Sequence, residues 1–168
     1  MKIDKDMERL LTRQNVVIVG TVNPDNSPNL SLKGLLKVDP EGYIHFSDLY
    51  RGKTFRNLKR DPRVSVMVFS IEEFTGFQFT GVAELIESGP LFEEAEADWQ
   101  AKKSWLLGRR ISKNVRKGFS HGRSEFQLPS LKALVRVAVE RVYDLSPDRS
   151  RGMGEARSGS PSGASPAE

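Results

Sequence analysis

Short runs of β-branched and aromatic residues, separated by tight-turn sequences, make up much of this 168-residue chain, and they constrain the fold more than any other feature. Val, Ile, Phe and Thr dominate the runs, as expected of strands. The connectors NPDNSP (23–28) and DPEG (39–42) are typical turn sequences. Strands joined this closely should pair as antiparallel neighbours. The predicted strands are 16–22, 30–38, 43–48, 63–70, 76–87 and 131–143.

Three segments have the apolar spacing or composition of helices. Residues 3–11 carry apolar side chains at helical spacing, and residues 52–60 hold good helix formers that stop before Asp61-Pro62. Residues 90–107 form the third segment, with an acidic first half that suits the positive end of a helix dipole. Six strands with a few short helices predict a mainly β protein built as a small antiparallel β-barrel.

The composition divides the chain into one domain and a tail. Residues 146–168 contain six Ser, four Gly and three Pro, and Met153 is their only large apolar residue. Such a segment buries too little surface to offset the entropy lost on ordering. We therefore predict a domain over residues 1–145 and a disordered Ser/Gly/Pro-rich tail over 146–168.

The composition also excludes several classes of site. There is no Cys, and the two His, His45 and His121, occur in no triad or metal-protease signature, so we expect no metal site. The net charge of +4 is too modest to argue for nucleic acid. No stretch reaches the roughly 18 apolar residues of a spanning helix, and a cytoplasmic protein without a membrane partner is expected.

The most chemically suggestive stretch is 46–54, where a strand runs into the start of a helix. Unpaired backbone N–H groups and the helix dipole favour an anion there, Lys53 adds a charge, and Thr54 adds a hydroxyl donor. Lys33 comes from a neighbouring strand, beside a mid-strand Gly34 that suggests close approach of a ligand. The sequence argues against a nucleotide P-loop, because Ser47 stands where its first Gly is needed and the flanking segments lack a parallel α/β pattern. The stretch predicts a cradle for one phosphate.

Seven segments in order then resemble the FMN-binding split-barrel proteins related to pyridoxamine 5′-phosphate oxidase, over residues 10–145. The segments are GTV (20–22), PN (28–29), LKV (36–38), GYIHFSD (42–48), GKTFRNL (52–58), DPRVSV (61–66) and FTGVAE (79–84). The resemblance implies a six-stranded split β-barrel that forms a homodimer, with FMN in a groove at the dimer interface. It also implies cofactor-binding positions, which by motif are Ser31, Leu32, Lys33, Gly34, Ser47, Asp48, Lys53 and Thr54, the last two at the phosphate.

The chain departs from the specific oxidases of this family. They carry an Arg-rich strand and a C-terminal Arg/Trp ending, whereas this chain has SLKG at 31–34 and VERVYDL at 139–145. The resemblance therefore implies a flavin-dependent oxidoreductase whose partner is NAD(P)H or an unidentified small-molecule redox substrate. The alternatives are a non-catalytic FMN-binding or electron-carrier protein, a deazaflavin (F420) or haem binder on the same fold, and a nucleic-acid-binding barrel.

Two further features have more than one interpretation. Trp99 and Trp105 lie on the third predicted helix, where core packing is the default, and the alternative is that one of them, Trp105, covers a flavin bound to the partner subunit. Residues 102–123 hold eight Lys or Arg and no acid. This segment is either a solvated face, a surface for an anionic substrate or NAD(P)H, or a contact for nucleic acid.

Overall fold

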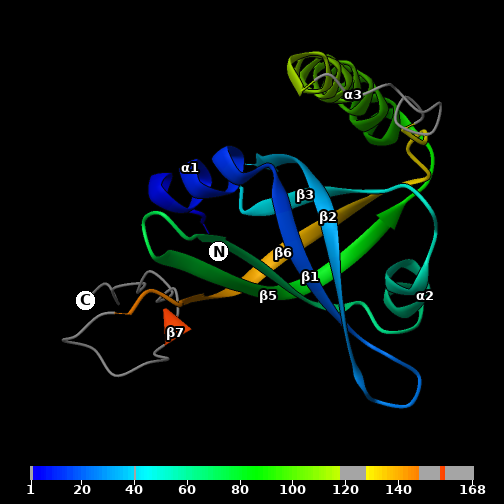
Figure 1. The fold of residues 1–168 in the computed structure, drawn as a ribbon. Coiled ribbons are helices and arrows are strands. Elements are labelled where there is room, and N and C mark those ends of the chain that lie inside the picture. The colour runs from blue at the N-terminus through cyan, green and yellow to red at the C-terminus, as the bar shows by residue number, and fades with distance from the viewer. Residues whose placement is uncertain (1, 40, 118–127, 148–155, 158–168) are drawn as a thin grey trace, which may run out of the picture.

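The computed structural model describes residues 2–39, 41–117, 128–147 and 156–157, with the backbone alone described for 105–117 and 156–157. Three helices accompany the strands (Figure 1). The elements in chain order are α1 (Lys5–Gln14), β1 (Val16–Val22), β2 (Pro28–Asp39), β3 (Tyr43–Asp48), α2 (Lys53–Arg60), β4 (Arg63–Ser70), β5 (Thr75–Ile86), α3 (Pro90–Lys117), β6 (Ala133–Asp144) and β7 (Ala156–Arg157).

The first six strands form a closed antiparallel barrel, which confirms the predicted fold class. Their order is β3-β2-β1-β4-β5-β6, and β3 pairs with β6 to close the sheet on itself. β7 is a two-residue strand that pairs with β6. β2 pairs with β3 only between Leu35 and Asp39, so within the described part of the chain its residues 28–34 have a strand partner on the β1 side alone.

Alternate residues of each strand fill the barrel. Val17 and Val19 of β1, Phe46 of β3 and Phe79 of β5 are all buried in one apolar cluster. α1 covers one end of this cluster with an apolar face of Met7, Leu10 and Leu11. Asp4 caps that helix by accepting hydrogen bonds from the backbone N–H groups of residues 6 and 7.

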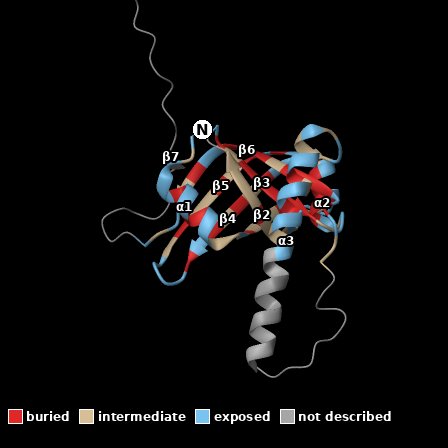
Figure 2. Cartoon of the chain, turned by 90° about the horizontal axis from the view of Figure 1, so that it is seen from above, coloured by how far each residue is buried: buried red, intermediate tan, exposed pale blue. Residues whose placement is uncertain are grey.

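α3 packs on the outside of the barrel through a second apolar cluster. Trp99 and Ala95 of α3 contact the segment around Leu131 and Leu134. The Trp99 indole N–H also donates to the carbonyl of Pro129 at 2.9 Å. Figure 2 shows the beginning of α3 against the barrel.

α3 ends at Lys117, ten residues beyond the predicted end at 107. The segment 108–117 contains no Pro, and its one Gly costs only about 1 kcal/mol in a helix. Gly108, which is a common helix-ending residue directly after 107, therefore lies inside α3. No helix in the described residues is long and apolar enough to cross a membrane.

Two predicted features fall mostly beyond the part of the chain that the structure describes. The tail 146–168 is described only at residues 146–147 and 156–157, so its disorder stays a prediction. His121, the Trp105 side chain and most side chains of the basic segment 102–123 also lie outside the described residues. Their predicted roles stay predictions.

Candidate functional site

The start of α2 is a helix end without a side-chain cap. Gly52 is the N-cap residue, and no side chain in the described part of the chain makes a capping hydrogen bond there. The first turn contains no acid and begins with the exposed Lys53. Since the first backbone N–H groups of a helix have no partner within it, this end presents N–H donors and a positive dipole. The arrangement suits an oxygen anion such as a phosphate.

Two hydroxyl groups meet beside this helix end. Thr54 is the second residue of α2 and is buried, with its Oγ1 at 2.8 Å from Oγ of Ser31 on β2. The Asn29 side-chain amide lies 3.4 Å from the same Thr54 oxygen. β2 therefore supplies polar groups to the helix start from residues 29 and 31, which point to the same side of the strand. We refer to the first turn of α2 and these residues of β2 as the cradle, the place where the sequence predicts a phosphate site.

Lys33 is engaged by Asp48. Its Nζ lies 2.6 Å from Asp48 Oδ2, and the Asp48 side chain is fully buried. The other carboxylate oxygen accepts hydrogen bonds from the backbone N–H groups of Tyr50 at 3.2 Å and Arg51 at 2.6 Å. Arg51 has a left-handed φ of 46°, so the carboxylate stabilises a strained turn that leads into α2. The Lys33–Asp48 pair therefore holds the turn that precedes α2.

The opposite face of β2 and β3 lies under α3. The Ser47 hydroxyl donates to the Gly34 carbonyl at 3.3 Å, and Ser47 is buried. A Cβ on Gly34 would lie 3.1 Å from the Ser47 hydroxyl oxygen and 4.0 Å from the Trp99 ring. Lys102 of α3 donates a hydrogen bond to the carbonyl of Leu35, the next residue along β2. This face is therefore packed tightly against protein groups.

Lys53 also affects the turn between β1 and β2. The pKa of the Asp25 carboxyl is lowered, mainly by hydrogen bonds from Ser27 and to a smaller extent by the charge of Lys53. Lys53 has no ion-pair partner within hydrogen-bonding distance among the described residues, so its ammonium group is available to an anion.

His45 is placed away from this cradle. It lies on the outer side of β3, buried near Lys37 and Arg136, and neither of its ring nitrogens has a hydrogen-bond partner among the described residues. Burial, aided by these two cations, lowers its pKa to about 4. His45 is therefore neutral at pH 7. The described residues contain no cluster of three or more His, Cys, Asp or Glu that could hold a metal ion.

Comparison of this sequence with protein-family models identifies its family. The family model for pyridoxamine 5′-phosphate oxidase matches residues 3–146. The chain belongs to the pyridoxamine 5′-phosphate oxidase family. Among curated proteins, none matches the chain by sequence.

Several solved structures share the fold of this family member. HupZ from Group A Streptococcus has a TM-score of 0.63 and 20% identity over 86% of this chain and 95% of its own. A pyridoxamine 5′-phosphate oxidase-related, FMN binding protein from Nostoc punctiforme has a TM-score of 0.52 and 14% identity, over 83% of this chain and 78% of its own. An F420 reductase has a TM-score of 0.52 and 17% identity, over 83% and 98%. These likenesses concern the fold.

The structure sorts the predicted cofactor residues of this family member into two groups. Ser31, Lys33, Asp48 and Thr54 lie on one side of β2 and β3, joined in pairs by the contacts described above, with Lys53 at the helix end. Leu32, Gly34 and Ser47 belong to the other side, as the alternation of a strand requires. Leu32 is 72% exposed, whereas Gly34 and Ser47 are packed near Trp99.

Three polar residues of the cradle had no role in our sequence analysis. Asn57 donates to Thr21 Oγ1 at 3.1 Å, and Asn29 donates to the same oxygen at 3.1 Å. Asn57 and Thr21 are buried. The sequence did offer one indication of these contacts. Asn is a weak helix former, so an Asn inside a short helix such as α2 indicates that its side chain makes hydrogen bonds.

Proposed function

We propose that this protein binds FMN non-covalently and acts as a flavin-dependent oxidoreductase on a small-molecule redox substrate or NAD(P)H. The observation that carries the proposal is the uncapped start of α2, where Lys53 and the Thr54–Ser31 hydroxyl pair converge. Helix ends of this kind bind phosphate through backbone N–H groups and the dipole. Membership of the pyridoxamine 5′-phosphate oxidase family supports a flavin as the phosphate-bearing ligand.

In this proposal the chain's own residues bind and orient the cofactor. FMN supplies the redox chemistry when bound. Lys53 attracts the phosphate, and Thr54 or Ser31 donates a hydroxyl proton to one of its oxygens. The Lys33–Asp48 pair contributes by holding the turn before α2, since the Lys33 charge is already neutralised by the buried carboxylate.

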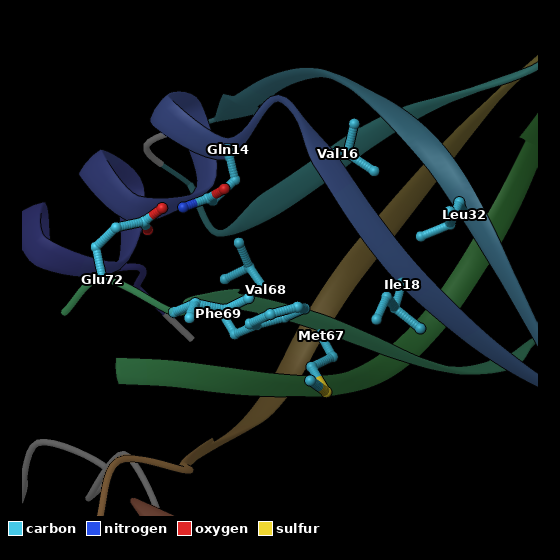
Figure 3. Close-up of a pocket in the computed structure, with 9 residues that line it drawn as sticks. Gln14, Val16, Ile18, Leu32, Met67, Val68, Phe69 and Glu72 are labelled. Atoms are coloured by element: carbon cyan, nitrogen blue, oxygen red, sulfur yellow. The ribbon is translucent and has the colours of Figure 1, made fainter. Parts of the chain in front are cut away.

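We further propose that a second copy of the chain covers the outer apolar face of the barrel. We define this face by outward-pointing residues of β1, β2 and β4, namely Val16, Ile18, Leu30, Leu32, Met67 and Phe69. Leu30 and Leu32 are 73% and 72% exposed. Ile18 pairs with both Leu32 and Met67, so the face is continuous across three strands. A cavity of about 250 Å³ lies on it (Figure 3).

Continuous apolar faces of this kind mark association surfaces, and a homodimer is the commonest symmetric solution. The face shares β2 with the phosphate cradle, because Leu30 and Leu32 alternate with Asn29, Ser31 and Lys33 along one strand. A dimer through this face would therefore bring the second subunit close to a flavin bound along β2. That relationship supports the homodimer and the shared cofactor groove.

Three other functions would use the same barrel. A non-catalytic FMN-binding or electron-carrier protein needs the same cradle but no substrate. A deazaflavin such as F420 is the second alternative, favoured by the fold that this chain shares with an F420 reductase. Haem is the third, and it requires an axial ligand. His45 does not suit that role, since it is buried outside the cradle.

The first experiment is to purify the protein without added cofactor and record its visible absorption spectrum. A flavin spectrum, with FMN identified by mass spectrometry after denaturation, would support the proposal. A colourless protein that takes up no added FMN would overturn it, and a released deazaflavin or a haem spectrum would select the corresponding alternative. Steady-state turnover with NAD(P)H then distinguishes the oxidoreductase from the carrier, because a carrier reacts only with a protein partner.

A further inference from the structure

Three buried polar atoms without a hydrogen-bond partner lie close together on the outer side of the barrel. Both ring nitrogens of His45 and Nε of Arg136 have no partner among the described residues. His45 on β3 and Arg136 on β6 are direct cross-strand neighbours, and Lys37 on β2 is the neighbour of His45 on its other side. Side chains at directly paired positions share one side of a sheet, with Cβ atoms about 4.5–5.5 Å apart. The imidazole of His45 therefore lies between two cations.

The first turns of α3 cover this side of β3. His45 and Ser47 alternate with core residues of the strand, yet both are only 2% exposed. Glu94 of α3 reaches the row at Lys37, where its carboxylate lies 2.6 Å from Nζ, and the Trp99 ring packs near Ser47. Five residues of helix span about 7.5 Å, and two residues of strand span about 6.7 Å. The helix from Glu94 to Trp99 therefore runs alongside the strand from His45 to Ser47.

α3 is attached to the barrel by contacts that are separate from the barrel core. Its apolar cluster around Trp99 is distinct from the cluster that fills the barrel. In the described residues, the polar contacts of α3 with the barrel and the segment before β6 are the Lys37–Glu94 pair and hydrogen bonds donated by Trp99 and Lys102. Elements held in this way can open locally while the rest of the fold stays intact.

A proton on His45 would be unfavourable while α3 is docked. Charged side chains act on the ring from all three neighbouring elements, namely Lys37 and Asp39 of β2, Arg136 of β6 and Glu94 of α3. Protonation would give the ring two N–H donors with no acceptor among the described residues, and Glu94 is already paired with Lys37. Burial and the two cations accordingly lower the pKa of His45 to about 4.

Release of α3 removes this penalty. A ring that meets water has an ordinary pKa of about 6.5, so the released state takes up a proton between about pH 6.5 and pH 4. The state that binds more protons gains as the pH falls. Acid therefore favours the released state over the docked one.

We propose that α3 is an acid-sensitive cover, whose first turns leave β3 when His45 is protonated and thereby uncover Gly34 and Ser47. This inference goes beyond the proposed function and does not depend on a bound flavin. Gly34 and Ser47 are two of the positions that the family resemblance assigns to the cofactor, and they are enclosed while α3 is docked. Release gives a ligand access to a side of β2 and β3 that protein groups now fill.

Hydrogen–deuterium exchange of the purified full-length protein tests the inference, because it detects rare openings. The readout is the protection factor of amides in residues 90–104 of α3 and 16–22 of β1, at pH 7.5 and pH 5.0. We expect α3 to be less protected than β1 at both pH values. Its protection should fall by at least about tenfold at pH 5.0, and by up to about 25-fold if α3 alone accounts for the burial of His45. Equal protection of α3 and β1 would overturn the inference, because α3 would then open only when the whole protein unfolds.

His45→Gln removes the titrating ring and keeps a polar side chain. The protection of α3 should then change less than about threefold between the two pH values, whereas His121→Gln, at the other His of the chain, should keep the full change. Asp39 and Glu94 titrate in both variants. A fall that persists in His45→Gln would therefore assign the release to carboxyl groups and overturn the inference, as would an unmodified protein that shows no fall. If His45→Gln fails to fold, as judged by its thermal transition, His45→Leu takes its place.

Discussion

The ammonium group of Lys33 lies 2.6 Å from the carboxylate of Asp48, whose side chain is fully buried and also accepts two backbone hydrogen bonds. The carboxylate thus fixes the turn that delivers α2 to the cradle, and Lys33 compensates its charge. The family resemblance counts Lys33 among the cofactor-binding residues. In this structure Lys33 acts on the site indirectly, because it pairs with the carboxylate that holds the turn before α2.

Replacement of Lys33 by Met should destabilise the protein by about 3 kcal/mol, because it leaves the buried Asp48 carboxylate without its counter-ion. Urea unfolding at pH 7 measures the change. The matched control is Lys37→Met, which breaks the more exposed pair with Glu94 and should cost less than about 1 kcal/mol. Equal effects of the two substitutions would contradict the structural role of the Lys33–Asp48 pair.

Replacement of Lys53 by Met should weaken FMN binding about tenfold or more, since it removes the free cation at the start of α2. Titration of the apoprotein with FMN at two salt concentrations gives the affinity and its salt dependence, which should be smaller in the variant. Lys59→Met serves as control, because Lys59 is exposed in the last turn of the same helix. The same loss of affinity in Lys59→Met would mean that general positive charge is responsible.

Gly81 lies at a bulge between β5 and β6, where a Cβ would come within 2.0 Å of the backbone carbonyl oxygen of Ala138. Gly81→Ala therefore forces the two strands apart, and we expect a loss of about 2–3 kcal/mol or more in unfolding free energy. Gly20→Ala is the control, since a Cβ there makes ordinary contacts at 3.5 Å. A Gly81→Ala protein as stable as Gly20→Ala would show that the bulge is not as tight as described.

His45 should make stability depend on pH between about 4 and 6.5. Its folded pKa of about 4, caused mainly by burial, is below the unfolded value of about 6.5. In that window the unfolded chain binds more protons, so stability falls as the pH decreases, by at most about 3 kcal/mol.

Comparison of the unmodified protein with His45→Leu at pH 7.5 and pH 4.5 isolates this contribution. Carboxyl groups with lowered pKa, such as Asp61, also lose stabilisation in acid, but they do so in both proteins. The variant should lose less stability than the unmodified protein between the two pH values. Identical losses would show that His45 titrates normally in the folded state.

Leu32→Glu should convert the proposed homodimer to a monomer, because it places a charge on the outer apolar face at a residue that is 72% exposed. Light scattering after size-exclusion chromatography gives the mass of each form. Leu145→Glu is the control at an exposed apolar residue that follows β6, outside that face. A monomeric unmodified protein would contradict the proposed assembly.

Much of the fold could be predicted from local sequence. The predicted strands 16–22, 43–48 and 63–70 agree with β1, β3 and β4, because clear turn sequences and Pro residues bound them. The start of α2 was also recognisable, since a helix that begins with Gly and Lys after a strand has an open N-terminus from its sequence alone. The end of α3 at Lys117 was not, since Gly108, which commonly follows the last residue of a helix, lies inside α3.

The helix start at residues 52–54 was predictable from the sequence, but its side-chain contacts with β2 were not. Lys53 and Thr54 are adjacent in sequence, so the helix end could be inferred directly from a local motif. The partners of Thr54 come from β2, 23 and 25 residues earlier in the chain, and only barrel closure and strand register bring them to α2.

The amino-acid sequence by itself determined the strand pattern, the turns and the uncapped, acid-free helix start at residues 52–54, because these depend on neighbours in the chain. Tertiary structure alone decided that Lys33 pairs with Asp48, that Ser47 is enclosed near Trp99, and that Asn57 directs its amide toward Thr21. These contacts depend on which side of each strand faces which helix. Strand register and the packing of segments that are distant in the sequence determine that side, and no local sequence pattern encodes the register or the packing.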